Sequence, residues 1–234
     1  MKRTLLLFLL ITAISQLGNA QIRLIPKAGY ALYSLKTESN SYGGDVKFKS
    51  GFLVGAGLNI TINDMFSVQP ELLFLQKGWK EEQYIDFGGG DFDEYISSFT
   101  LNYLEVPILA QLTFGNTTKF FVSAGPSIGY GIGGKYVFEY NGLESGVTYS
   151  ERYDSKVKFG SRPDNDQSND VYLDNALDIG GIAGFGVLLM NKIQIEVRYS
   201  LGFTNLVDEN PDIQDNTSKN FGFQFNVGVP IGLN

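Results

Sequence analysis

The sequence predicts an all-β protein: an eight-stranded antiparallel up-and-down transmembrane β-barrel. Two observations support this prediction. Apolar and polar residues alternate strictly along several segments, and short turns alternate with long polar connections between these segments. From Phe221 to Leu233 every second residue is apolar, and a similar alternation runs from Ile193 to Thr204. A period of two predicts a strand whose two faces differ chemically.

Eight segments have this strand character. They are residues 22–35, 48–62, 66–80, 98–114, 118–133, 176–190, 193–206 and 219–233. Three of the connections between them are tight turns rich in Asn, Asp and Gly, at 63–65, 115–117 and 191–192. The other connections are long and polar, at 36–47, 81–97, 134–175 and 207–218. Short turns at one rim and long loops at the other are typical of bacterial outer-membrane barrels, in which the long loops are extracellular.

We expect the apolar face of each strand to contact lipid. The four long connections hold 20 of the 25 acidic residues, which leaves the strands nearly uncharged. No charged residue occurs between Gly51 and Asn63 or between Phe221 and Asn234. The alternative, a soluble lipocalin-like barrel, would need charged residues on the outward face of every strand, because that face would meet water.

Residues 1–20 have the features of a secretory signal peptide. Lys2 and Arg3 precede an apolar run that is too short to span a bilayer comfortably, and small residues lead up to Ala20. We expect cleavage after Ala20 and export to the outer membrane. One outer-membrane β-barrel domain would then cover residues 21–234, with 134–175 as a long extracellular loop.

The predicted loop 134–175 is unusually long for a segment without structure of its own, and such loops are often functional. The strand-like stretches 136–140 and 149–159 suggest an alternative. In that interpretation the two strands flanking the loop continue above the membrane as a hairpin.

Composition argues against several classes of function. The chain has no Cys, no His and a formal net charge of −7. Removal of Lys2 and Arg3 with the signal peptide would leave 16 basic residues against 25 acidic ones, a charge of −9. This charge argues against nucleic-acid binding. Without His and Cys the chain lacks the usual general base and the commonest transition-metal ligands, so we expect no enzyme, no catalytic residue and no cofactor.

Two motifs suggest ligand sites but lack the context that such sites require. Residues 129–135 contain the spacing G-x-G-x-x-G, yet a nucleotide site needs a helix to follow, and the next residues are strand-like. Three carboxylates are spaced like the start of a calcium loop: Asp164, Asp166 and Asp170. Asn169 stands where that loop needs Gly, and Asn175 where it needs a bidentate Glu. We therefore favour a solvated loop, with calcium binding as the alternative.

The alternation also identifies side chains that point into the barrel. Besides Arg23 and Lys77, the charged side chains among them are five that we expect to pair: Lys27, Glu71, Glu105, Glu196 and Arg198. The interior of an eight-stranded barrel is just wide enough for side chains to fill, and buried charges need partners. We predict that these residues form one ion-pair network that plugs the lumen. The alternative is that some of them lie at a rim and meet water.

Two short motifs resemble a known family. Residues 103–109 read Tyr-Leu-Glu-Val-Pro-Ile-Leu, and residues 124–129 read Ala-Gly-Pro-Ser-Ile-Gly. Together they are similar to the PorT-like outer-membrane β-barrel family of Bacteroidetes, in which a Tyr-Leu-Glu-hydrophobic-Pro strand precedes a Gly-Pro strand. The resemblance implies an eight-stranded outer-membrane barrel, and a namesake branch associated with secretion and gliding machinery.

The function expected from these observations is envelope architecture or partner binding through the extracellular loops. The barrel would be a monomer in contact with outer-membrane lipid, and its protein partner could belong to the secretion machinery that the resemblance implies. A narrow passive pore is the first alternative, and a soluble periplasmic ligand carrier is less favoured.

Overall fold

The computed structural model describes residues 21–37, 44–207 and 218–233, so the predicted signal peptide lies outside the described residues. Within the described part, no helix is long and apolar enough to cross a membrane. The strands are β1 (Ile22–Thr37), β2 (Asp45–Thr61), β3 (Phe66–Gly88), β4 (Asp91–Gly115), β5 (Thr118–Glu144), β6 (Val147–Phe159), β7 (Val171–Leu173), β8 (Leu177–Leu189), β9 (Ile193–Gly202), β10 (Ser218–Gly228) and β11 (Ile231–Leu233).

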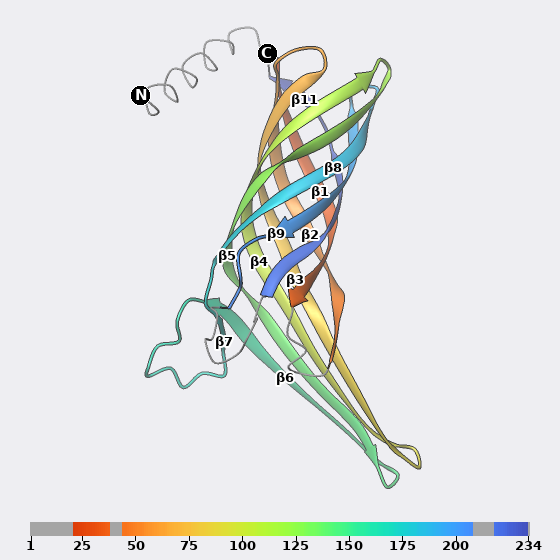
Figure 1. The fold of residues 1–234 in the computed structure, drawn as a ribbon, viewed down its shortest axis with the longest axis vertical. Coiled ribbons are helices and arrows are strands. Elements are labelled where there is room, and N and C mark those ends of the chain that lie inside the picture. Colours follow the sequence, from red (N-terminus) through yellow and green to blue (C-terminus); the bar gives the residue numbers. More distant parts are fainter. Residues whose placement is uncertain (1–20, 38–43, 208–217, 234) are drawn as a thin grey trace.

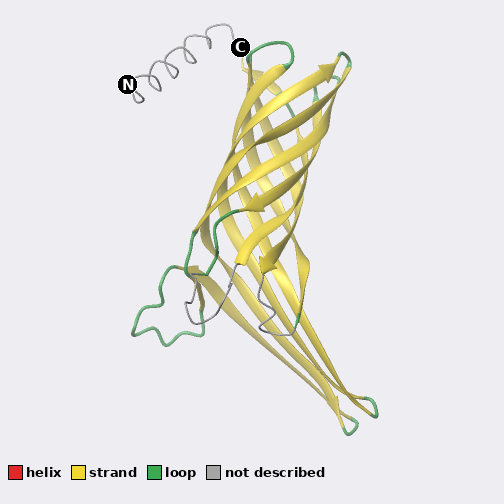
Figure 2. Ribbon diagram, viewed as in Figure 1, coloured by secondary structure: helices red, strands yellow, loops and turns green. Residues whose placement is uncertain are grey.

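Eight of these strands form a closed antiparallel ring in the order β1–β2–β3–β4–β5–β8–β9–β10, and β10 pairs with β1. Figures 1 and 2 show the resulting tilted barrel. The predicted eight-stranded up-and-down barrel is therefore confirmed. The other three strands lie outside the ring, and β6 pairs with the end of β5. β7 pairs with the end of β6 in parallel, and β11 pairs with the start of β1 beyond the interruption at Pro230.

The two faces of the barrel wall differ as the alternation predicts. On β10, Phe225 is 46% exposed, whereas its neighbours Gln224 and Asn226 are buried. The same pattern occurs on β9. On β1 and β4 the exposed face is likewise apolar, but the lumenal face mixes polar side chains such as Lys27 and Glu105 with apolar ones such as Ala31 and Leu109. Apolar residues on the outside and polar residues in the lumen are the arrangement that suits a barrel in a lipid bilayer.

The prediction of a long loop at 81–97 is wrong. β3 and β4 continue through this region as paired strands and meet at a tight turn, where Gly88, Gly89 and Gly90 all have positive φ. Sequence alternation is weak here because both faces of the hairpin lie beyond the lipid-facing part of the barrel, so neither face has to be apolar.

Residues 134–175 are also not one irregular loop. β5 continues to Glu144 and pairs with β6, and Ser145 and Gly146 form the turn between them. The hairpin alternative is therefore right for residues 134–159 and for the continuation of β5. Its second strand, β6, is not a continuation of the wall strand β8, because residues 160–176 separate them. Together β3, β4, β5 and β6 form a four-stranded sheet that projects beyond one end of the barrel (Figure 1). We call this the projecting sheet: residues 79–88, 91–99, 134–144 and 147–157.

A β-bulge marks the point where β5 leaves the barrel wall. Asn102 pairs with Gly133, but Tyr103 pairs with Gly131, so Ile132 is an extra residue in β5. Gly133 has a φ of 128°, which favours glycine. Gly131 leaves room for the ring of Phe159, because a Cβ there would lie only 2.3 Å from that ring. The G-x-G-x-x-G spacing thus has a structural explanation in strand bending and close packing.

We predict that Phe225→Arg lowers the free energy of unfolding by about 2–4 kcal/mol, the range measured for Arg or Lys on the lipid face near the bilayer centre. The charged side chain would have to enter the hydrocarbon or distort the bilayer around it. Urea unfolding in phosphatidylcholine vesicles measures the change, and Phe225→Leu is the control for loss of the ring. An arginine variant as stable as the leucine variant would contradict the lipid-facing assignment.

Candidate functional site

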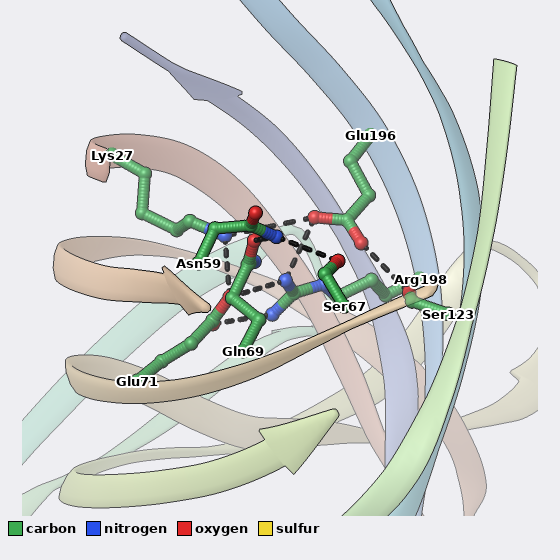
Figure 3. A network of polar contacts seen from close by, with 8 residues as sticks. All are labelled: Lys27, Asn59, Ser67, Gln69, Glu71, Ser123, Glu196 and Arg198. Carbon is green, nitrogen blue, oxygen red and sulfur yellow. Dashed lines mark hydrogen bonds and ion pairs between the residues drawn. The ribbon is translucent and has the colours of Figure 1, made fainter. Parts of the chain in front are cut away.

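The lumen contains a network of buried ion pairs. Arg198 on β9 donates two hydrogen bonds to Glu71 on β3, from Nη1 to Oε2 and from Nη2 to Oε1, each 2.7 Å long. Arg198 Nη2 also lies 2.7 Å from Glu196 Oε2. Lys27 on β1 lies 2.6 Å from Glu71 and 3.7 Å from Glu196. Figure 3 shows these two cations and two anions meeting across the lumen.

Polar side chains satisfy further groups around these charges. Gln69 donates a hydrogen bond to Glu71, and Ser123 on β5 donates one to Glu196 over 2.9 Å. Asn59 on β2 bridges Gln69 and Ser67 (Figure 3). Strands from most of the ring therefore contribute to one hydrogen-bonded layer.

Glu105 departs from the predicted single network and belongs to a second buried cluster. Its Oε2 lies 2.6 Å from Lys77 Nζ, which also lies 3.0 Å from Asp178 Oδ2. The ammonium group of Lys77 lies over the rings of Tyr33 and Tyr103, at 5.3 and 5.0 Å. The separation arises because Glu105 pairs with Lys77 on the neighbouring strand β3, further toward the projecting sheet than Glu71, and Lys77 also reaches Asp178 on β8.

Asp178 is a lumenal charge that sequence reasoning missed. It is 2% exposed, and Asn220 on β10 donates a hydrogen bond to it over 2.9 Å. The signal was available in the alternation of β8, because Ile182 and Asp178 share one face of that strand. Its position at the end of a predicted strand made a rim location equally plausible.

An apolar cap lies above the second cluster, at the end of the barrel that bears the projecting sheet. Its buried members come from the wall and from the segments that cross the opening: Trp79, Leu101, Tyr103, Val157, Leu173 and Leu206. Phe159 packs edge-on against Tyr103, with ring centroids 5.7 Å apart. A second buried apolar cluster, of Ala31, Tyr33, Leu53 and Leu75, includes a β3 residue that lies between Glu71 and Lys77 in the chain. Charged and apolar groups therefore both fill the lumen from the Lys27 level to the cap.

The calcium alternative finds little support in the geometry. Asp166 accepts hydrogen bonds from the Tyr172 hydroxyl and the Ser168 backbone, which hold the pKa of its carboxyl well below the usual range. Asp170 lies 2.7 Å from Lys158 Nζ. In the described parts of the chain, no three carboxylates, histidines or cysteines converge in a way that could hold a metal ion.

The projecting sheet carries a continuous aromatic face. This inner face continues the lumenal face of the wall, since Trp79, Phe99 and Tyr136 lie opposite one another in register. Trp79 and Phe99 stack at 4.3 Å, and Phe99 and Tyr136 are 4.6 Å apart. Further out, neighbouring rings lie 4.8–6.4 Å apart: Tyr95, Phe138, Tyr140, Tyr149 and Tyr153.

Asp93 organises the outer part of this face. Its carboxylate accepts hydrogen bonds from Tyr95 and Tyr140, each 3.2 Å long, and from Tyr149. Burial among neighbouring rings, together with bonds to Tyr140 and Asp93, raises the pKa of Tyr95 to about 12. The bond to Tyr149 and burial raise the pKa of Tyr140 to about 12. The phenols therefore remain neutral donors across the physiological range.

The closed ring, the apolar exterior and the filled lumen define an integral outer-membrane β-barrel. Residues 15–208 match the model of the outer membrane protein beta-barrel domain family. The chain belongs to this family, and the match and the barrel together point to the outer membrane. No curated protein sequence matches the chain.

Several solved structures are similar to the chain at low identity. Ail, the attachment invasion locus protein of Yersinia pestis, matches with a TM-score of 0.40 and 12% identity, covering 91% of this chain and 99% of Ail. OprG from Pseudomonas aeruginosa matches with a TM-score of 0.40 and 10% identity, covering 93% and 98% of the two chains. Neisserial surface protein A has a TM-score of 0.40 and 11% identity, with 88% and 96% covered.

We predict that Arg198→Met lowers the free energy of unfolding by about 3–5 kcal/mol, because Glu71 and Glu196 lose the cation they share in a buried site. The double variant Arg198→Met, Glu71→Met should recover part of this loss, since Lys27 and Glu196 remain as a neutral pair. Arg152→Met on the exposed side of the projecting sheet is the matched control and should change stability little. Equal urea midpoints for Arg198→Met and wild type would contradict the lumenal network.

A pH titration should show tyrosines that ionise at a higher pH than free tyrosine. The pKa values of Tyr95 and Tyr140 are higher in the folded state than in the unfolded chain, so their neutral forms stabilise the folded projecting sheet below pH 10. This contribution is lost as the pH rises toward about 12. Tyrosinate absorbance should therefore have a component with a midpoint near 12. In Asp93→Asn this component should shift toward lower pH, because the carboxylate no longer disfavours a nearby phenolate. A single midpoint near 10 in the folded wild-type barrel would contradict the cluster.

Proposed function

We propose that this protein is a non-conducting outer-membrane anchor that presents the projecting sheet to a protein partner in the cell envelope. The observation that carries this proposal is the filled lumen. Arg198, Glu71 and Lys77 are buried in ion pairs across it, and the apolar cap closes one end. Because the barrel interior is occupied by its own side chains, the surface available to a partner is the part that extends beyond the membrane.

The projecting sheet is a rigid structure rather than a set of loose loops. Its strands form continuous ladders, with β4 paired to both β3 and β5 along its length. Rigid display lowers the conformational entropy that binding would cost, which favours recognition by a preformed surface. In the expected orientation, with tight turns at the periplasmic rim, the projecting sheet lies on the extracellular side.

The similarity to the PorT-like family supports a narrower version of the proposal, in which the partner belongs to a secretion complex. This version rests on the motifs at 103–109 and 124–129 alone. Photo-cross-linking in native membranes from Tyr153, the exposed ring at the rim of the inner face, would identify neighbouring proteins by mass spectrometry. Cross-links to secretion components would support this version, and cross-links restricted to unrelated proteins would contradict it.

We predict that the purified barrel in planar bilayers shows no steady openings. The paired charges and buried apolar residues that occupy the lumen should block a continuous water path, and the apolar cap would disfavour ions even if the polar layers rearranged. A variant that lacks the cap, with Phe159, Leu173 and Leu206 all replaced by Ser, tests how far the polar layers close the lumen alone. Steady conductance of the wild type would overturn the anchor proposal in favour of a narrow passive pore.

A further inference from the structure

The two faces of the projecting sheet carry different charges. On the outer face, three carboxylates lie close to cations: Glu139 with Arg152, Asp154 with Lys135, and Glu82 with Lys47 and Lys80. The register adds two carboxylates outside these ion pairs and one further cation to this face: Asp86, Glu94 and Lys156. On the inner face, the carboxylates are Glu81, Asp93, Glu151 and, next to the two turns, Asp91 and Glu144. The register places no Lys or Arg on that face. The outer face is therefore internally neutralised, whereas the inner face keeps a net negative charge.

Aromatic donors hold the inner carboxylates in place. Trp79 Nε1 donates to Glu81 over 2.8 Å, the Tyr153 hydroxyl donates to Glu151 over 2.6 Å, and three tyrosine hydroxyls donate to Asp93. These neutral donors orient each carboxylate without cancelling its charge. Each carboxylate also has remaining acceptor positions, since an ionised carboxyl group offers about four lone-pair sites.

Carboxylates set among aromatic ring faces form a surface suited to organic cations. A guanidinium group stacks on an aromatic ring and donates paired hydrogen bonds to a neighbouring carboxylate, and Arg does both better than Lys. Tyr153 is 56% exposed and lies next to Glu151, so one such ring and carboxylate pair is accessible. The inner face has no cation of its own that would compete for these groups.

We propose that the inner face of the projecting sheet binds an arginine-bearing, basic polypeptide segment of a partner protein. The proposal rests on the proposed function, and it names the chemistry of the partner. Charge complementarity selects this occupant over a neutral glycan, which would use the rings but gain little from unpaired carboxylates. Charge complementarity also favours the basic segment over a second copy of the chain, because the inner face of that copy would carry the same negative charge.

The test uses the full-length barrel in phosphatidylcholine nanodiscs and a fluorescent peptide of alternating arginine and serine. Reference peptides carry lysine or glutamine in place of arginine. Fluorescence anisotropy should show the arginine peptide bound most tightly and the glutamine peptide at least about tenfold more weakly. Raising NaCl from about 50 mM to about 500 mM should weaken arginine binding about tenfold, as expected when screening acts on an exposed charged surface.

Two matched variants distinguish binding at the inner face from nonspecific attraction of the peptide to an acidic protein. The inner variant is Asp93→Asn, Glu151→Gln, and the outer variant is Glu139→Gln, Asp154→Asn, so the two change the net charge equally. The inner variant should weaken arginine binding about tenfold, and the outer variant less than about twofold. Tyr153→Leu should weaken it about two- to fivefold, the size of exposed cation–π contacts. Heat-modifiable gel mobility confirms that each variant is folded.

Three results would overturn the proposal. In the first, the inner and outer variants weaken binding of the arginine peptide equally. In the second, the arginine and glutamine peptides bind equally well. In the third, a neutral dextran oligosaccharide binds in place of the peptide, and its binding does not depend on salt. The proposed function fails by a different observation, steady conductance in planar bilayers. If the barrel does not conduct and cross-links a protein from Tyr153 but does not bind the arginine peptide, the proposed function stands and only the proposed basic partner segment is wrong.

Discussion

The structure depends on one constraint: a charge inside a closed eight-stranded barrel is surrounded by protein and cannot reach water. Its desolvation cost is offset only by a direct, hydrogen-bonded partner. Arg198 meets this requirement with two hydrogen bonds to Glu71, and Lys77 meets it with one to Asp178. Glu196 and Glu105 add ion pairs to the same two cations. These pairs also oppose register slips, because a shift of one residue would move each charge to the lipid face.

Because the lumenal charges are paired with one another, the barrel serves to hold the protein in the membrane, and recognition of a partner is left to the projecting sheet. The wall contacts lipid outside and is filled inside, so the barrel itself offers a partner little accessible chemistry. The projecting sheet has the opposite properties, because both of its faces lie beyond the barrel and are free to be polar. Its outer face forms internal salt bridges, whereas its inner face combines stacked rings with carboxylates that have no cationic partner in the sheet.

Sequence alternation predicted most of the wall because the bilayer imposes a strict chemical difference between its faces. It placed Lys27, Glu71, Glu105, Glu196 and Arg198 inside correctly, and all five are buried. It did not pair Glu105 with Lys77 on the neighbouring strand β3, or Lys77 with Asp178 on β8, because both pairings depend on how the strands stagger around the ring. It also missed the strands at 81–97, where no bilayer forces the two faces to differ.

The sequence by itself determined a closed barrel with an apolar exterior, because the alternation of its strands has a single stable arrangement in lipid. Only the tertiary structure decided the nature of the projecting sheet. The bulge at Ile132 adds one residue to β5 and reverses its phase, so Tyr136, Phe138 and Tyr140 join the inner face. Without that extra residue, Lys135, Val137 and Glu139 would occupy the inner face. Such a phase change depends on pairing with β4 and β6, which local alternation does not encode.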